Sequence, residues 1–191
     1  MRRLGIFGGT FNPIHHGHLI LAECAREQFA LDRVLFIPTA TPPHKAFREL
    51  LPGRDRLRLI RLAIHGHPAF HTDDMELARG GVSYSLETVR ALHARHPRAK
   101  LFFLVGADML RVRWYGLPEL TRLCTFVVAS RAAQPLAHRF RGMRRLSMPP
   151  VDISSSMIRA RARAGASIRY LVPEAVEREI RRRRLFQGVR R

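Results

Sequence analysis

Two glycines, a threonine and three histidines follow a short apolar run near the amino terminus. The segment 8–18 reads GGTFNPIHHGH, directly after the apolar residues 4–7. The apolar run predicts a buried strand, and a helix is expected from about Gly17. Backbone N–H groups at a helix N-terminus and nearby imidazoles can bind phosphate together. We therefore interpret this segment as a nucleotide phosphate site.

Two other interpretations of the same segment stay open. The pair Gly8-Gly9 could be a tight turn between strand and helix, which parallel α/β folds need in many places. His15, His16 and His18 could be surface residues or metal ligands, although no cysteine lies nearby and their spacing differs from H-E-x-x-H. The phosphate interpretation is favoured because His15 and His18 would both face the N-terminus of the expected helix.

A second polar group lies near the carboxyl terminus, where Ser154–Ser156 precede an arginine-rich stretch. Hydroxyl residues in this order are typical of a helix cap. A cap position is also a place where donors hold phosphate, and Arg159, one turn further on, could reach the same anion. The sequence does not decide between these two interpretations.

Two further segments have an ordinary and a functional interpretation. His44 and Lys45 follow two prolines, and a solvated turn is the favoured reading of that pair alone. Trp114 and Tyr115 precede a glycine and a proline and would either pack in the core or form an aromatic platform for a flat ring. Because the single tryptophan of the chain lies in a turn, we favour the platform.

Strands and helices alternate along the chain and must position these residues. Strands are predicted at 3–7, 33–37, 69–72, 100–105 and 125–129, a surface loop at 39–52, and helices at 17–30, 54–65, 85–96, 118–123, 157–163 and from Pro173. This alternation predicts an α/β fold with a parallel sheet and helices on both faces. Ligands of such sheets bind at the carboxyl ends of the strands, where the segment 8–18 would lie.

Composition limits the class of protein. The 191 residues are 46% hydrophobic, which suits one domain spanning 1–191. Cys24 and Cys124 are far apart, so a disulfide scaffold or a cysteine zinc site is not expected, and a cytoplasmic setting fits best. No secretory signal and no membrane-length apolar run are found.

The charge is strongly positive, with 34 lysines and arginines against 15 acidic residues and a formal net charge of +19. Such a balance suits a nucleic-acid surface, an acidic membrane surface or an enzyme of polyphosphates. Most of the arginines, including those at 54–61, 139–145, 159–163 and 181–184, are expected on solvated helix faces.

These motifs together resemble those of the bacterial nicotinate-mononucleotide adenylyltransferases. The likeness runs from about Leu4 to Phe186 and rests on GGTFNPIHHGH at 8–18, PHK at 43–45, GGVSYS at 80–85, GAD at 106–108, WY at 114–115 and ISSSMIR at 153–159. H-x-G-H and I-S-S-x-x-I-R are typical of the wider nucleotidyltransferase superfamily, and the other blocks narrow the likeness to this family. Ser85 and Ser156 stand where threonine is usual, and both keep the hydroxyl.

The resemblance implies a single Rossmann-like domain with a helical C-terminal segment at about 154–186. It implies transfer of AMP from ATP to nicotinate mononucleotide in NAD biosynthesis, giving deamido-NAD and pyrophosphate. Mg²⁺ would accompany ATP, with no metal site on the protein, no membrane or nucleic-acid partner, and a possible homo-oligomer.

The resemblance also assigns roles residue by residue. The catalytic set is His15, His18, Lys45 and Arg159. The ATP set is Gly8, Gly9, Thr10, Phe11, His15, His18, Ser154, Ser155 and Arg159. The mononucleotide set is His44, Lys45, Tyr84, Ser85, Gly106, Asp108, Trp114 and Tyr115.

The residues fit this chemistry independently of the family. A phosphate monoester has a second pKa of about 6, so the attacking group is already an anion at neutral pH and needs no catalytic base. The reaction needs charge neutralisation and in-line geometry, which histidines, a lysine, an arginine and helix N-termini provide.

Three alternatives stay open. The acceptor could instead be nicotinamide mononucleotide or phosphopantetheine. The chain could be a basic RNA- or DNA-binding module, or a nucleotide sensor without catalytic activity.

Overall fold

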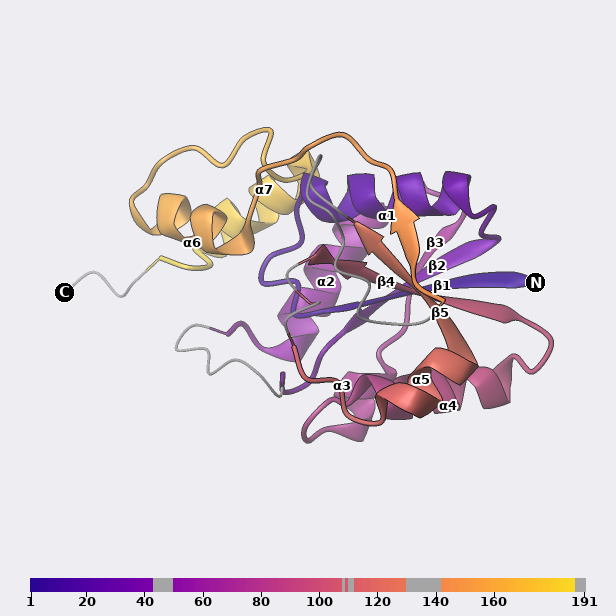
Figure 1. Cartoon of the computed structure of the whole chain (residues 1–191). Helices are drawn as coiled ribbons and strands as arrows, with labels where there is room; N and C mark the ends of the chain where they lie inside the picture. Colours follow the sequence, from indigo (N-terminus) through magenta and orange to yellow (C-terminus); the bar gives the residue numbers. More distant parts are fainter. Residues whose placement is uncertain (43–49, 108, 110–111, 130–141, 188–191) are drawn as a thin grey trace.

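A single sheet of parallel strands, in the order β3-β2-β1-β4-β5-β6, runs through the described part of the chain (Figure 1). The structure is a computed structural model that describes residues 1–42, 50–107, 109, 112–129 and 142–187. The candidate residues His44, Lys45 and Asp108 lie outside these ranges. The strands are β1 (Arg3–Gly9), β2 (Arg33–Pro38), β3 (Phe70–Thr72), β4 (Lys100–Gly106), β5 (Cys124–Ala129) and β6 (Arg144–Leu146).

The central strands are apolar on both sides because both faces of the sheet are covered. In β4, Phe102 and Leu104 pack into one hydrophobic cluster, and Leu101 and Phe103 pack into the other. This alternation of two buried faces produces the continuous apolar runs that the sequence shows. The predicted parallel sheet with two covered faces is therefore confirmed.

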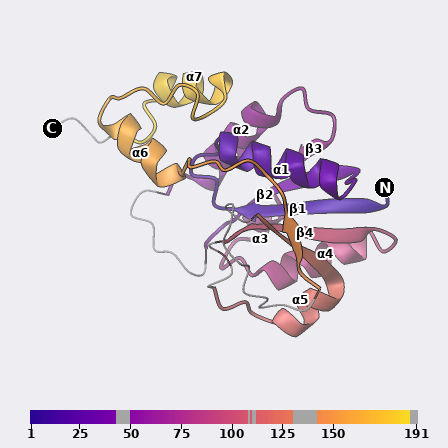
Figure 2. The same ribbon diagram turned by 45° about the horizontal axis from the view of Figure 1, so that its top comes forward.

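The helices form two layers. One cluster of buried side chains joins the sheet to α1 (His16–Gln28), α2 (Gly53–Ile64), α6 (Ser155–Arg163) and α7 (Glu174–Arg182). The other joins it to α3 (Met75–Arg79), α4 (Ser85–Arg95) and α5 (Leu117–Leu123). Figures 1 and 2 show α6 and α7 side by side at the end of the molecule toward which β1 runs. The first turn of α6 can therefore reach the carboxyl end of β1.

Three features differ from the predicted elements. Helix α1 ends at Gln28 rather than Ala30, which has a left-handed backbone with φ of 47°. The short helix α3 was not predicted; the Asp73 carboxylate accepts a hydrogen bond from the Met75 N–H at 2.9 Å near its start. Strand β6 was missed because only Leu146 of its three residues is buried. Such short elements leave no periodic apolar pattern.

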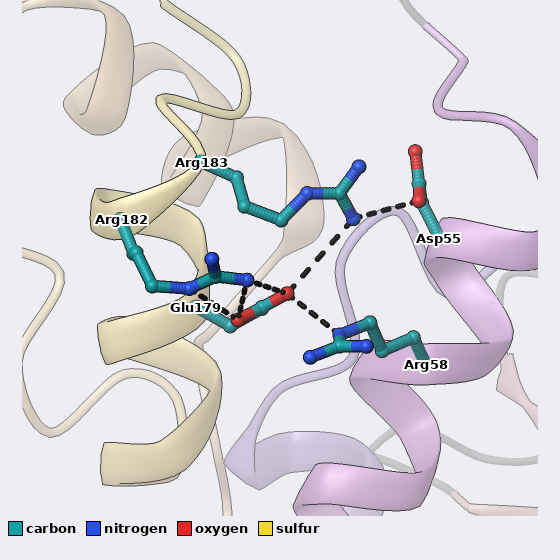
Figure 3. Close-up of polar contacts among 5 residues, drawn as sticks. All are labelled: Asp55, Arg58, Glu179, Arg182 and Arg183. Carbon is teal, nitrogen blue, oxygen red and sulfur yellow. Dashed lines mark hydrogen bonds and ion pairs between the residues drawn. The ribbon is translucent and has the colours of Figure 1, made fainter.

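An ion-pair network attaches α7 to α2 (Figure 3). The buried Glu179 carboxylate accepts a hydrogen bond from Arg58 Nε at 2.7 Å and is also paired with Arg182. Arg183 donates to Asp55 Oδ1 at 2.7 Å. These contacts fix α7 against α2.

None of the helices in the described ranges combines the length and the apolar character needed to span a bilayer.

Candidate active site

The loop after β1 lies where the order of the sheet reverses. Strand β2 pairs with β1 on one side and β4 pairs with it on the other, so successive connections leave β1 in opposite directions. Ligands of open parallel sheets bind outside the carboxyl ends of the strands at this kind of point. Gly8 and Gly9 end β1, and Gly106 ends the neighbouring β4. The predicted position of the phosphate segment is thus confirmed.

His15 and His18 form a stacked pair at the start of α1. Their ring centroids are 3.7 Å apart with an interplanar angle of 27°. The His15 backbone N–H donates to His18 Nδ1 at 3.2 Å, so a neutral His18 carries its proton on Nε2. Phe7 and Phe11 contact the His18 ring edge-on at 5.8 and 5.1 Å. The packing therefore fixes both the orientation and the tautomer of His18.

Burial keeps both imidazoles uncharged at neutral pH. It lowers the pKa of His15 to about 4, with a smaller contribution from His16. It also lowers the pKa of His18 well below 6.5, with His15 adding to the effect. Among the described residues, the buried Nδ1 atom of His15 has no hydrogen-bond partner. A buried polar atom without a partner is costly, and a phosphate oxygen could accept a hydrogen bond from it.

Gly17 leaves the space that the His15 ring occupies. A Cβ atom at position 17 would lie 3.1 Å from both Cε1 and Nδ1 of His15. This separation is tighter than ordinary contact, so a larger residue would displace the ring. The glycine of H-x-G-H therefore has a packing role as well as its place at the helix start.

The first turn of α6 packs against the same loop from the opposite end of the chain. Ser155 Oγ donates to the Pro13 carbonyl at 2.8 Å, and Arg159 Nη1 donates to the Asn12 carbonyl at 2.9 Å. Ser154 is the N-cap residue and accepts a hydrogen bond from the Met157 N–H at 3.2 Å. The cap interpretation of the serines is confirmed, and the anion-site interpretation stays a prediction.

Two helix N-termini therefore face one small region. Neither α1 nor α6 has an acidic residue in its first turn. The first turn of each helix thus carries no carboxylate that would compete with an anion for the positive end of the helix dipole. Together with the two imidazoles and Arg159, they form an environment suited to an anion.

Arg56 is a functional candidate that the sequence analysis missed. The prediction of a solvated face is wrong for this residue, whose exposed fraction is 1%. Its Nη1 donates to the Thr10 carbonyl at 2.8 Å and its Nε to the Leu51 carbonyl at 2.9 Å. Leu59 and Ile60, three and four positions further on, are fully buried. The place of Arg56 on this apolar helix face was the signal that could have revealed it.

The side chain of Phe11 also lies in the core. Its exposed fraction is 2%, and its ring packs against Phe7 and Phe36. Any contact of Phe11 with a nucleotide would thus come from its backbone. Its backbone is left-handed, with φ of 47°.

The aromatic candidates lie just before the first turns of α4 and α5. Trp114 packs edge-on against Phe103 and Phe126 at 5.7 and 5.3 Å, and its indole N–H donates to the Met109 carbonyl at 3.2 Å. The rings of Tyr84 and Tyr115 are 5.1 Å apart. Trp114 therefore has the core contacts of the first interpretation, and its role as a platform stays a prediction.

Phe103 joins the aromatic group to the phosphate loop. Its Cζ atom lies 3.8 Å from the place that a Cβ atom would take at Gly8. Ser85 begins α4, directly after Tyr84. Phe103 thus contacts Trp114 of the mononucleotide set and lies beside Gly8 of the ATP set.

Within the described residues, no group of three or more histidine, cysteine, aspartate or glutamate side chains is arranged to hold a metal ion.

The parallel sheet, the reversal of its order at β1 and the anion-suited loop define an α/β protein of Rossmann-like fold with a candidate nucleotide-phosphate site. Residues 6–161 match the family described as Cytidylyltransferase-like. A probable nicotinate-nucleotide adenylyltransferase of Synechococcus sp. (strain JA-3-3Ab) is 44% identical over 196 residues, covering 97% of this chain and 95% of the relative. The chain belongs to the cytidylyltransferase-like family and, within it, to the nicotinate-nucleotide adenylyltransferases.

Solved structures share the fold. Plasmodium falciparum nicotinic acid mononucleotide adenylyltransferase complexed with APC superposes with a TM-score of 0.81 at 15% sequence identity, covering 97% of this chain and 98% of that one. The same enzyme complexed with NaAD gives a TM-score of 0.80 at 16% identity, with the same coverage of both chains. At this level of identity the likeness concerns the fold.

Proposed function

We propose that this protein transfers AMP from ATP to nicotinate mononucleotide, forming deamido-NAD and pyrophosphate in NAD biosynthesis. The observation that carries the proposal is the meeting of the stacked His15–His18 pair with the N-termini of α1 and α6 at the end of β1. Curated relatives at up to 44% identity bear the name of this activity. The P. falciparum neighbour, which binds NaAD in its structure, supports the nucleotide class.

The phosphate loop would bind the triphosphate of ATP. Neutral His15 and His18 would donate hydrogen bonds to phosphate oxygens, and Arg159 would supply a positive charge. Backbone N–H groups of Gly9 and Thr10 would add donors at the end of β1. Charge that develops on the departing pyrophosphate is thus met by donors that are already in place.

The acceptor phosphate would attack the α-phosphorus of ATP directly. A bond forms between an acceptor phosphate oxygen and the α-phosphorus, and the bond from that phosphorus to the bridging oxygen of the β-phosphate breaks. The electron pair leaves with pyrophosphate. Because the attacking phosphate is already ionised near pH 7, the reaction needs positioning and charge stabilisation and no general base.

The acceptor would lie on the aromatic side of the site. Tyr84, Ser85, Gly106, Trp114 and Tyr115 would surround the pyridine ring and the ribose. His44, Lys45 and Asp108 complete the proposed set and lie outside the described residues. A flat ring packs well on aromatic side chains, which supports this side of the site for the pyridine.

Magnesium would enter as part of the Mg–ATP substrate. Mg²⁺ keeps several water ligands and is usually held by substrate phosphates with one or two carboxylates rather than by a protein cage. A cytoplasmic location and a homo-oligomeric state are further expectations, which cell fractionation and light scattering would test.

A pyrophosphate-release assay with ATP and a panel of acceptors tests the proposal. We expect saturable release with nicotinate mononucleotide at a higher kcat/KM than with nicotinamide mononucleotide or phosphopantetheine. Faster turnover of either of the other two would reassign the acceptor. ATP binding without any release would favour a sensor, and salt-sensitive binding of RNA or DNA without a saturable ATP site would favour a nucleic-acid module.

A further inference from the structure

Residues 39–41 form a hydrogen-bonded link between the end of β1 and the segment that precedes α4. On one side the link is bonded to Gly9, which belongs to the proposed ATP set, and on the other to the segment 82–85, which carries two proposed acceptor residues. We propose that Ser83 is a positioning residue that holds the acceptor segment against this link, and through it against the end of β1. This inference rests on the proposed function and deepens it.

The first half of the link joins residue 39 to the ATP side of the site. The Thr39 N–H donates to the Gly9 carbonyl at 3.0 Å, next to the pair of Gly9 with Pro38 in the β1–β2 register. This bond continues the pairing of the two strands as far as the last residue of β1. Residues 39–41 therefore leave β2 from a position that is fixed against the start of the phosphate loop.

The second half of the link joins residues 40 and 41 to Ser83. Ser83 Oγ accepts a hydrogen bond from the Ala40 N–H at 3.0 Å, and the Ser83 N–H donates to the Thr41 carbonyl at 3.0 Å. Thr41 also forms an isolated parallel β-bridge with Val82. One residue thus bonds to two consecutive backbone positions, once through its side chain and once through its main chain. These bonds fix the place from which the acceptor residues 84 and 85 continue.

The Ser83 hydroxyl is the part of this link that a side-chain substitution can remove. The exposed fraction of Ser83 is 6%, so water has little access to its side chain. An N–H group that loses its acceptor inside a protein is costly. Without the hydroxyl, Ala40 would lose its acceptor and the segment 82–85 would be held to the link by main-chain contacts alone.

The relative position of the two segments matters for an in-line transfer between two bound substrates. The proposed ATP and acceptor residues would stay in place chemically when the Ser83 hydroxyl is removed, so each substrate would still find its own contacts. A misplacement of about 1 Å between reacting groups can cost on the order of 10² in rate. The link therefore acts on kcat more than on the binding of either substrate.

The test compares Ser83→Ala and Ser83→Cys with the wild-type protein in pyrophosphate release. Alanine removes the acceptor, whereas cysteine fills similar space and offers only a weak sulfur acceptor. We expect Ser83→Ala to lose about 10-fold to 100-fold in kcat and Ser83→Cys to lose about 3-fold to 10-fold. The KM values of both substrates should stay within about threefold of wild type.

The matched control is Thr88→Val, which removes another buried hydroxyl close to the start of α4. The exposed fraction of Thr88 is 1%, and its Oγ1 donates to Glu76 Oε1 at 2.7 Å, a bond between α4 and α3. The control variant should lose thermal stability and keep its kcat within about threefold of wild type. A general loss of buried hydrogen bonding is thereby separated from the loss of the link at Ser83.

Three outcomes would overturn the inference. A folded Ser83→Ala variant with a kcat within threefold of wild type would do so. A wild-type kcat in Ser83→Cys would assign the role of Ser83 to packing instead of hydrogen bonding. A loss of kcat in Thr88→Val as large as that in Ser83→Ala would show that the effect is not specific to the link.

Two further results separate the possible failures. If Ser83→Ala does not fold, Ser83→Cys decides alone, with a loss of kcat supporting the positioning role and an unchanged kcat refuting it. A wild-type protein that releases no pyrophosphate refutes the proposed function and this inference together, whereas an active wild type with unaffected variants refutes the inference alone.

Discussion

Lowering the pH from 7 to 5 should destabilise the ligand-free protein through His15. The pKa of this residue is about 4 in the folded protein, against an ordinary value of 6.5. Between these values the unfolded chain binds a proton that the folded protein does not bind. The free energy of unfolding therefore rises with pH in this range, and the stabilisation is lost as the pH falls from 6.5 toward 4.

The size of the effect follows from the difference between the two pKa values. One pKa unit corresponds to about 1.4 kcal/mol, so His15 accounts for about 3 kcal/mol over the whole range. Roughly 2 kcal/mol of this is lost by pH 5. His18, whose pKa is also lowered, acts in the same direction.

Urea unfolding at pH 7 and pH 5 measures the effect when wild type is compared with His15→Asn. The wild-type protein should lose about 2 kcal/mol more than the variant between the two pH values, while His65→Asn, at an exposed histidine, should behave as wild type. Tripolyphosphate should reduce the wild-type loss, because a bound anion raises the pKa of an adjacent imidazole. Equal losses for wild type and His15→Asn would refute the burial argument for this imidazole.

Three further predictions concern activity. His18→Ala should lower kcat by about 10²–10³ with little change in the KM of the acceptor, because the hydrogen bond from His18 to a phosphate oxygen strengthens in the transition state. Steady-state kinetics with an unchanged kcat would remove His18 from the mechanism. Gly17→Ala should lower kcat by about tenfold or more, because the new Cβ atom would displace the His15 ring. Circular dichroism would show that the variant is folded, and wild-type turnover in the folded variant would contradict the packing role of Gly17. Trp114→Ala should reduce stability by about 3 kcal/mol through its lost core contacts. It should also weaken the binding of the mononucleotide while sparing that of ATP, and calorimetry that shows equal losses for both ligands would contradict a ring-binding role.

The sequence predicted the elements that bury side chains on a regular pattern. Strands β1, β2, β4 and β5 lie in the sheet interior, so their apolar runs are continuous and were recognised. Strand β6 exposes both of its arginines, so its sequence resembles a charged stretch more than a buried strand. Helix α3 has five residues, too few for an apolar period to show.

Prediction of the site succeeded where neighbours in sequence are also neighbours in space. The spacing of His15 and His18 predicts that both side chains lie together at the N-terminus of the helix, and in the structure the two rings stack. The contact of Ser155 with Pro13 joins residues 142 positions apart, which local patterns cannot specify. Arg56 was misjudged because an arginine among other arginines is usually solvated, and only the folded structure shows which carbonyls it binds.

A crystal structure with a non-hydrolysable ATP analogue and nicotinate mononucleotide would test the central claim most directly. We predict that the triphosphate lies at the end of β1, with its oxygens within hydrogen-bond distance of the His15 and His18 imidazoles and of Arg159, and that the acceptor phosphate faces the α-phosphate in line. A triphosphate bound elsewhere, with both imidazoles left without a ligand contact, would contradict it.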